Sequence, residues 1–143
     1  MSQDNLDEII DAVLDSSLEG IVATNTTLSR PDATNRPDYP QVLSETGGMS
    51  GTPLKQRSTD LIRHIFSRTK GKLTIIGVGG IFNAQDAWEK IGAGASLVQV
   101  YSGMVYEGPG MARSIVEGLC NQVEFHGLNS IQEAVGKELD FVE

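Results

Sequence analysis

The chain has 143 residues, the size of one ordinary domain, and its 39% hydrophobic and 21% charged residues are typical of a soluble globular protein. Its 11 basic and 19 acidic residues give a net charge of −8, which argues against nucleic acid or an anionic membrane surface as the main partner. We find neither an apolar run near the ~20 residues of a membrane span nor a signal-peptide pattern at the start.

The first part of the chain is predicted to form a helix, a short strand and a long loop. Apolar residues recur at helical spacing over residues 4–18, and Gly20 ends that helix. Residues 21–23, Ile-Val-Ala, read as a buried strand that leads directly into Thr-Asn-Thr-Thr at 24–27. Residues 29–52 are predicted to be loop, because they hold three prolines and a glycine-rich end; loops of this length are often lids or binding loops.

The middle of the chain alternates between helices and strands. Pro53 suits the first turn of a second helix, which Lys70-Gly71 ends. Two short apolar runs rich in β-branched residues, at 73–78 and 97–100, are predicted to be strands buried on both faces. Between them residues 83–91 have helical spacing, so this stretch forms a βαβ unit.

The last part of the chain is predicted to be helical. A fourth helix opens at Gly108-Pro109, and a short one starts at Ser130 with Glu133 completing a capping box. The single cysteine, Cys120, excludes an internal disulfide and is predicted to pack inertly on the apolar side of the fourth helix. The residues of that helix that we expect to face inward are Ala112, Ile115, Val116 and Leu119.

Strand–helix alternation predicts a parallel α/β fold. Three strands are too few for a closed barrel, since a (β/α)₈ barrel typically needs ~250 residues. We therefore expect about three βα units of a larger TIM barrel, with the first helix lacking a strand before it and residues 126–143 forming a helical tail. The side chains expected to face the missing strands are those of Val22, Ile76, Val78, Val98 and Val100.

Small residues follow two of these strands: glycines at 77, 79 and 80 after the first, and Ser102-Gly103 after the second. Ligands of parallel α/β proteins bind at the carboxyl ends of strands, and bare N–H groups beside a helix N-terminus can hold a phosphate. The pattern is not a Rossmann fingerprint, because position 82 is phenylalanine. The alternative is that these glycines only allow tight strand-to-helix packing.

The other candidate sites leave two readings open. Thr-Asn-Thr-Thr at 24–27 either reads a planar heterocycle with amide edges or caps a turn. Glycines at 47–51 form a hinge or a close backbone approach to a ligand. His64 and His126 lack metal-ligand spacing and are interpreted as surface or capping residues. The acidic residues are predicted to be mostly exposed, with no acid–base pair and no metal site.

Several segments together resemble the dihydroorotate dehydrogenase family, specifically its quinone-dependent class 2, over about residues 6–120. Each motif is modest, but their order and spacing are specific, and the Tyr-Ser-Gly ending at 101–103 favours class 2. The matching segments are residues 23–27, 46–53, 57–59, 75–81, 89–103 and 108–109.

The resemblance implies the C-terminal part of an FMN-containing TIM barrel that oxidises dihydroorotate to orotate in pyrimidine biosynthesis and passes electrons to a quinone. It also implies a peripheral location on the cytoplasmic side of the cell membrane for the full enzyme. The residues it assigns are Thr24, Gly51, Gly80, Tyr101 and Ser102 to FMN, the last two through backbone N–H groups to the phosphate, and Asn25 and Thr26 to the orotate ring.

The family's catalytic serine, its flavin-contacting lysine and its quinone-tunnel helices come earlier in the chain and have no match here. The resemblance thus implies no catalytic base in this chain, and expects either the missing part of the barrel or self-association. Two alternatives remain open: a non-catalytic half-barrel that binds FMN or another phosphate ligand, and a different phosphate-binding barrel enzyme, such as another flavin oxidoreductase.

Overall fold

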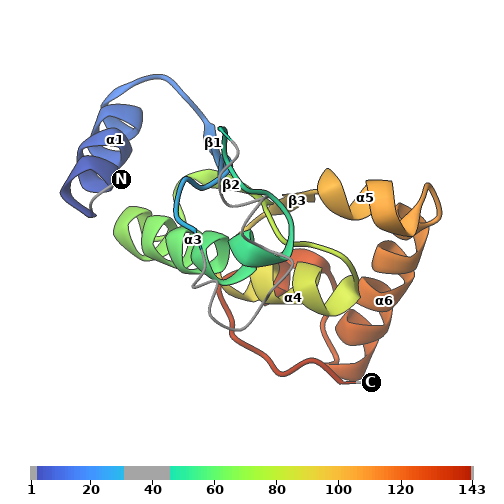
Figure 1. Ribbon diagram of the computed structural model, residues 1–143. Helices are drawn as coiled ribbons and strands as arrows, with labels where there is room; N and C mark the ends of the chain where they lie inside the picture. Colours follow the sequence, from blue (N-terminus) through green and yellow to red (C-terminus); the bar gives the residue numbers. More distant parts are fainter. Residues whose placement is uncertain (1–2, 31–45, 143) are drawn as a thin grey trace.

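The computed structural model describes residues 3–30 and 46–142 (Figure 1). The three prolines at 31, 37 and 40, on which the long-loop prediction depended, lie outside the described residues. The elements in order are α1 (Gln3–Asp15), β1 (Gly20–Ala23), the 3₁₀ turn η2 (Thr52–Leu54), α3 (Lys55–Thr69), β2 (Thr74–Val78), α4 (Ala84–Gly92), β3 (Leu97–Gln99), α5 (Ser102–Glu107), α6 (Met111–Phe125) and the 3₁₀ turn η3 (Ile131–Ala134).

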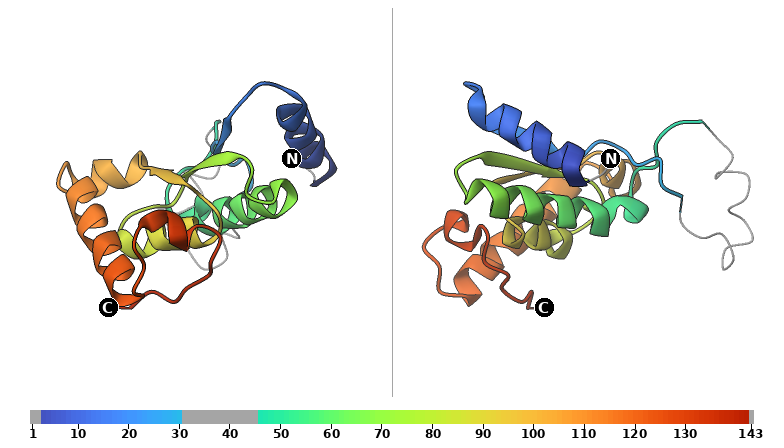
Figure 2. Two further views of the ribbon diagram at one scale, coloured as in Figure 1. Left: turned by 180° about the vertical axis from the view of Figure 1, so that it is seen from behind. Right: turned by 90° about the vertical axis from the view of Figure 1, so that its left-hand side faces the viewer.

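The three strands form one parallel sheet in the order β1-β2-β3, which confirms the predicted parallel α/β arrangement. Val22 pairs with Ile76, and Ile76 pairs with Leu97, so these three residues form one row across the sheet. The views in Figure 2 place α3 and α4 together along one face of the sheet. α1 packs beside α3, and α6 packs on α4.

The core lies between the sheet and the helices. Ile62 and Ile65 of α3 meet Ile75 of β2, and all three are at most 1% exposed. Gly77 of β2 leaves room for this packing, since a Cβ there would lie 3.0 Å from both Ala95 and Ile62. Burial of these side chains, worth about 1.5–3 kcal/mol each, holds the helices on the sheet.

The opposite face of the sheet is open, as expected for strands that face missing parts of a barrel, so burial on both faces is not reached within the described part of this chain. Val22 is 55% exposed and Leu97 is 57% exposed. Val98 and Val100 were expected on this face, but both pack against the core under α4 and α6. Because side chains alternate along a strand, Leu97 and Gln99 take the open face, one residue out of step with the prediction.

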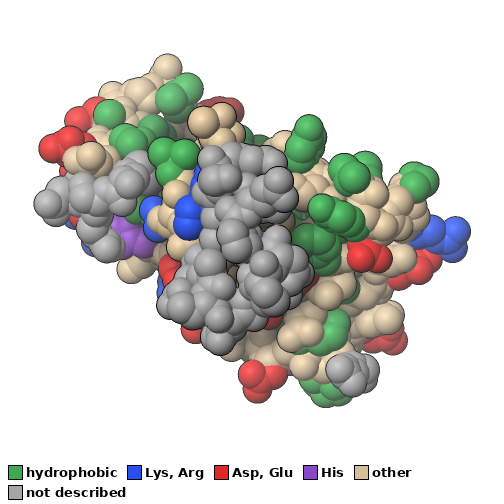
Figure 3. Space-filling model, in the orientation of Figure 1, with side chains coloured by type: hydrophobic (Ala, Val, Ile, Leu, Met, Phe, Trp, Pro, Cys, Tyr) green, Lys and Arg blue, Asp and Glu red, His purple; other side chains and the backbone are tan. Residues whose placement is uncertain are grey.

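The C-terminal part also differs from the predictions. α5 was not expected, and Met104, Val105 and Tyr106 are apolar residues exposed on it; hydrophobic side chains gather in this region at the upper right of Figure 3. Cys120 is exposed, so its predicted apolar packing is wrong. Ala112 and Val116 are also exposed, because Met111 and Ile115 form the buried side of α6.

The residues after α6 contain one 3₁₀ turn rather than a regular helix. Ser130 makes no side-chain cap hydrogen bond, so the predicted capping box does not form. The segment lies across α4 and α6: the indole Nε1 of Trp88 donates to Leu139 O at 2.9 Å, and the side chain of Gln122 exchanges two hydrogen bonds with the backbone of Val142. No helix within 3–30 or 46–142 is both long and apolar enough to cross a membrane.

Candidate functional site

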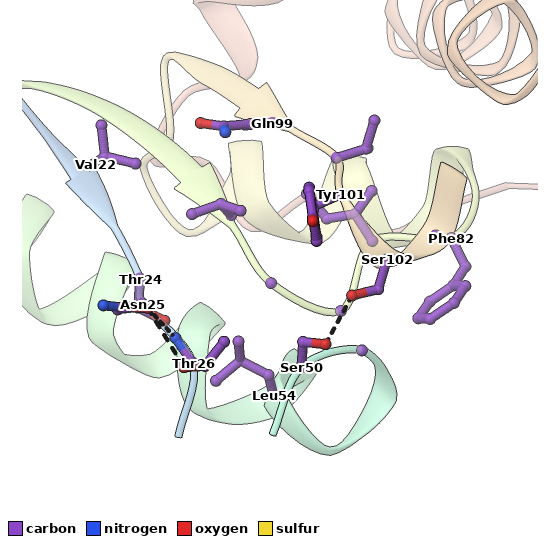
Figure 4. A pocket seen from close by; sticks show the side chains of 17 residues that line it. Val22, Thr24, Asn25, Thr26, Ser50, Leu54, Phe82, Gln99, Tyr101 and Ser102 are labelled. Carbon is purple, nitrogen blue, oxygen red and sulfur yellow. Dashed lines mark hydrogen bonds between the residues drawn. The ribbon is translucent and has the colours of Figure 1, made fainter. Parts of the chain in front are cut away.

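A pocket of about 400 Å³ lies where the three strands end (Figure 4). Its walls come from the segments after β1, β2 and β3 and from the loop that enters η2. The structure brings together every site residue that the sequence predicted: Thr24, Asn25, Thr26, Gly51, Gly80, Tyr101 and Ser102 all line this pocket. The carboxyl ends of parallel strands meet at one edge of a sheet, which is why residues so far apart in sequence converge.

The Thr24–Thr26 wall shows the local turn that the sequence offered as one of two roles, and it leaves polar groups unpaired within the described part of the chain. Asn25 Oδ1 accepts from the backbone N–H of Thr26 at 2.7 Å, so the side chain does order a local turn. Its Nδ2 group makes no hydrogen bond to another described residue and stays available as a donor. Thr24 Oγ1 is buried without a hydrogen-bond partner among the described residues, which is costly unless a ligand supplies one.

The loop before η2 is tied to this wall by its backbone. Thr27 and Met49 exchange backbone hydrogen bonds of 3.1 and 2.8 Å. A Cβ on Gly48 would lie 2.0 Å from Thr26 Oγ1, so only glycine allows this approach. Gly48 therefore makes a close backbone approach to Thr26, and the choice between a hinge and a close approach to a ligand stays open. The hydroxyl of Ser102 donates to Ser50 Oγ at 2.8 Å across the mouth of the pocket (Figure 4).

Residues 79–82, here called the glycine loop, form the floor of the pocket. Gly80 has φ +70°, and a Cβ on it would lie 2.4 Å from Lys55 Cα. The tight packing that the sequence offered as one reading is present at this loop, which also lines the pocket.

The N-terminus of α4 does not offer the free N–H groups that the sequence suggested. Asn83 Oδ1 accepts from Asp86 N at 2.9 Å, and Asp86 Oδ2 accepts from Phe82 N at 2.8 Å. Two acceptors of the protein thus occupy the end of the helix. By contrast, no side chain caps the start of α5, where Tyr101 is the N-cap residue and Ser102 the first helical residue.

Sequence reasoning missed several residues of the site. Gln99 lines the pocket from the open face of the sheet, and Ser50 and Phe82 line its mouth. The sequence did not predict Gln99 because Val98 and Val100, rather than Leu97 and Gln99, were assigned to the open face of β3. Ser50 and Phe82 were missed because only the glycines of their motifs were considered. Lys90 is fully buried, although a lysine inside an amphipathic helix is normally exposed, and no pattern in the sequence indicates it.

Lys90 belongs to a polar cluster behind the glycine loop. Its Nζ donates to Lys55 O at 2.7 Å and to Thr59 Oγ1 at 2.5 Å. Lys55 Nζ pairs with Asp86 at 2.5 Å and with Glu89 at 3.2 Å. Asp86 is 5% exposed and is an exception to the expectation that the acidic residues are mostly exposed.

The two lysines of this cluster titrate differently. Burial lowers the pKa of Lys90 from 10.5 to about 8, against the opposing effect of nearby carboxylates. Burial would also lower the pKa of Lys55, but hydrogen bonds to Asp86 and Glu89 outweigh it and raise that pKa above 10.5.

We expect the ¹³Cε resonance of Lys90 in the folded protein to titrate with a midpoint near pH 8. Because the folded pKa lies below the unfolded one, the charge on Lys90 costs stability below pH 8, and this cost disappears as the pH rises toward 10.5. NMR of protein labelled at lysine measures the midpoint, and Lys90→Arg assigns the signal. A midpoint above pH 10 would contradict the burial of the ammonium group.

Neither histidine lies in the pocket. His64 Nε2 lies 2.6 Å from Asp7 Oδ1, which links α3 to α1, and His126 stacks on Trp88 with ring centroids 5.5 Å apart. Among residues 3–30 and 46–142, no group of three histidine, cysteine or acidic side chains is placed to hold a metal ion. The predicted interpretation of both histidines as surface or capping residues is consistent with these contacts.

A family model described as dihydroorotate dehydrogenase matches residues 1–123. The chain belongs to the dihydroorotate dehydrogenase family. It is 52% identical, over 90% of its length, to a relative from Trichodesmium erythraeum named dihydroorotate dehydrogenase (quinone). A relative of the same name from Erythrobacter litoralis is 48% identical over 94% of this chain. The quinone-dependent class, predicted from the Tyr-Ser-Gly ending, is the class of these relatives.

Solved structures of this family share the fold. The dihydroorotate dehydrogenase of Eimeria tenella, solved in complex with ferulenol, matches 95% of this chain with a TM-score of 0.86 at 38% identity. The chain covers 35% of that protein and 35% of the Trichodesmium relative, so it spans about a third of their length. The three βα units are thus part of a TIM barrel, as the strand count predicted.

The residues of the pocket fit a flavin phosphate and ring. Thr24 Oγ1 is a buried polar atom that lacks a partner among the described residues, and Gly51 (φ +78°) and Gly80 expose their backbones to the pocket. The start of α5 has no side-chain cap, which leaves backbone N–H groups for an anion.

Proposed function

We propose that residues 1–143 are the C-terminal portion of an FMN-dependent dihydroorotate dehydrogenase that reduces a quinone, with residues 126–143 as its tail. The observation that carries this proposal is the convergence of three strand ends on one pocket, lined by all seven residues that the family resemblance assigns. The quinone acceptor and the peripheral membrane location belong to the whole protein and remain predictions for it.

In this proposal the residues of this chain bind and orient. The backbone N–H groups of Tyr101 and Ser102 hold the FMN phosphate, while Gly51 and Gly80 let the flavin lie against the backbone. Asn25 and Thr26 hydrogen-bond the orotate ring, the former through its available Nδ2 donor. FMN, when bound, accepts the hydride from dihydroorotate.

Proton abstraction falls to a base outside this chain. Ser50 and Ser102 carry hydroxyl groups at the pocket mouth, but they hydrogen-bond to each other, and no histidine, lysine or acidic side chain lines this pocket with them among the described residues. Their bond instead fixes the loop before η2 over the ligand, which helps to exclude water from the reacting atoms.

The test is a grafted enzyme, in which this chain replaces the matching 35% of the Trichodesmium erythraeum relative. We expect it to bind FMN and to oxidise dihydroorotate with a quinone acceptor at a rate comparable to the parent. FMN binding without turnover would favour the non-catalytic alternative. A well-folded graft that binds no FMN would overturn the proposal.

Asn25→Ala in the grafted enzyme is expected to lower kcat/KM for dihydroorotate about 5- to 100-fold, because a buried polar edge of the ring loses its donor. FMN affinity should change little, since Asn25 is assigned to the substrate. Steady-state kinetics and a flavin titration measure the two effects.

Asn129→Ala is the matched control, because Asn129 is also an exposed asparagine and its Nδ2 donates to Glu133 at 3.0 Å, in the segment after α6 and outside the pocket lining. This variant should keep the parent kcat/KM. An unchanged kcat/KM in Asn25→Ala would remove Asn25 from the substrate site.

A further inference from the structure

The glycine loop is held from behind by a buried group that does not line the pocket. Lys90 is 0% exposed, and Thr59 and Asp86 are each 5% exposed. Burying an ammonium group is expensive, even when it is hydrogen-bonded, and an apolar side chain of similar size often costs less. The cost of this cluster therefore indicates a role other than stability.

Two donors converge on one carbonyl in the first turn of α3. Lys55 O accepts from Lys90 Nζ at 2.7 Å and from Thr59 Oγ1 at 3.0 Å. Lys90 also reaches Thr59 Oγ1, so the backbone of Lys55 is bound to α4 and to the next turn of α3. This peptide group cannot move without breaking several hydrogen bonds at once.

Residues around this peptide group contact the glycine loop at three points. Lys55 Cα lies directly against Gly80, where a Cβ would come within 2.4 Å. The hydroxyl of Ser58 donates to Gly79 O at 2.9 Å. Asp86, paired with the Lys55 ammonium at 2.5 Å, accepts from Phe82 N at 2.8 Å. The backbone of Lys55 therefore sets how closely Gly80 can approach α3, while Ser58 and Asp86 bind the two ends of the loop.

We propose that Lys90 and Thr59 are positioning residues. They hold the glycine loop, through the backbone of Lys55, in the position that the ligand phosphate and ring require. They touch neither ligand nor reacting atoms, and they act on binding by keeping the loop in place before the ligand arrives. This inference rests on the proposed function, because it takes FMN as the ligand of the pocket.

Two threonines of α3 allow a matched test in the grafted enzyme. Thr59 and Thr69 are both buried, and each donates its hydroxyl to the carbonyl four residues earlier, at 3.0 and 2.8 Å. Only Thr59 also meets Lys90; Thr69 lies at the far end of the helix. Thr59→Val and Thr69→Val should lower the Tm of the FMN-free protein by similar amounts. Only Thr59→Val should raise the Kd for FMN, about five- to tenfold.

Lys90→Met separates positioning from stability. Methionine fills similar space without a charge, so the Tm of the FMN-free protein should stay level or rise. The Kd for FMN should nevertheless rise about tenfold, because Lys55 O loses the donor that ties it to α4. Thr59→Ser, which keeps the hydroxyl, should restore the parent Kd. Flavin fluorescence quenching measures Kd, and thermal unfolding measures Tm.

Equal changes of Kd in Thr59→Val and Thr69→Val, or an unchanged Kd in Lys90→Met, would overturn the inference and leave the proposed function standing. Failure of the unsubstituted grafted enzyme to bind FMN would instead count against the proposed function. The two failures are therefore distinguishable in one set of titrations.

Discussion

Gly80→Ala in the grafted enzyme is expected to raise the Kd for FMN about 100-fold or more, with activity at ordinary FMN concentrations nearly lost. An added Cβ would lie 2.4 Å from Lys55 Cα and 2.6 Å from Lys55 N, which are backbone atoms that cannot turn aside. The glycine loop must then rise into the pocket. Overpacking of this kind typically costs about 1–3 kcal/mol, in addition to about 1–2 kcal/mol for a side chain at positive φ.

Gly127→Ala is the matched control for the cost of placing a side chain at positive φ. Gly127 has φ +63°, close to the +70° of Gly80, but a Cβ on it would meet nothing within 4 Å. It lies after α6, outside the residues that line the pocket. Both variants should lose similar stability from the positive φ, and only Gly80→Ala should lose FMN. Retention of the parent Kd in Gly80→Ala would show that the loop is not the floor of the flavin site.

The 143-residue chain by itself is expected to show no dihydroorotate dehydrogenase activity and to associate. Its sheet has one open face on which Val22 and Leu97 are more than half exposed, and unpaired strand edges invite further pairing. Absence of the proposed external base would remove a further ~10²–10⁴-fold of rate. Light scattering reports assembly, and dye reduction with added FMN reports chemistry.

A pair of charged variants identifies the surface responsible for association. Leu97 on the open sheet face is 57% exposed, and Val116 on α6 is 58% exposed. Leu97→Lys should raise the fraction of monomer, while Val116→Lys should leave it unchanged. A monodisperse chain that turns over dihydroorotate without any partner would show that the catalytic base lies within these residues.

The sequence by itself determined the fold class, because its signals are local. β-branched runs that alternate with helical spacing predicted β1 to β3 and α3, α4 and α6, and the strand count predicted part of a barrel. Two local motifs also predicted residues that converge on the pocket. They are the glycines after β2 and Thr-Asn-Thr-Thr after β1.

Only the tertiary structure decided which face of each strand meets the helices and what holds the pocket in shape. Leu97 and Val98 are both apolar and point to opposite faces of β3, so the sequence could not tell that Val98 packs inward and Gln99 lines the pocket. Lys55, Thr59, Asp86 and Lys90 carry no pattern as a set, since α3 and α4 bring them together across up to 35 residues of chain. Their burial and hydrogen bonds exist only once those two helices pack behind the glycine loop.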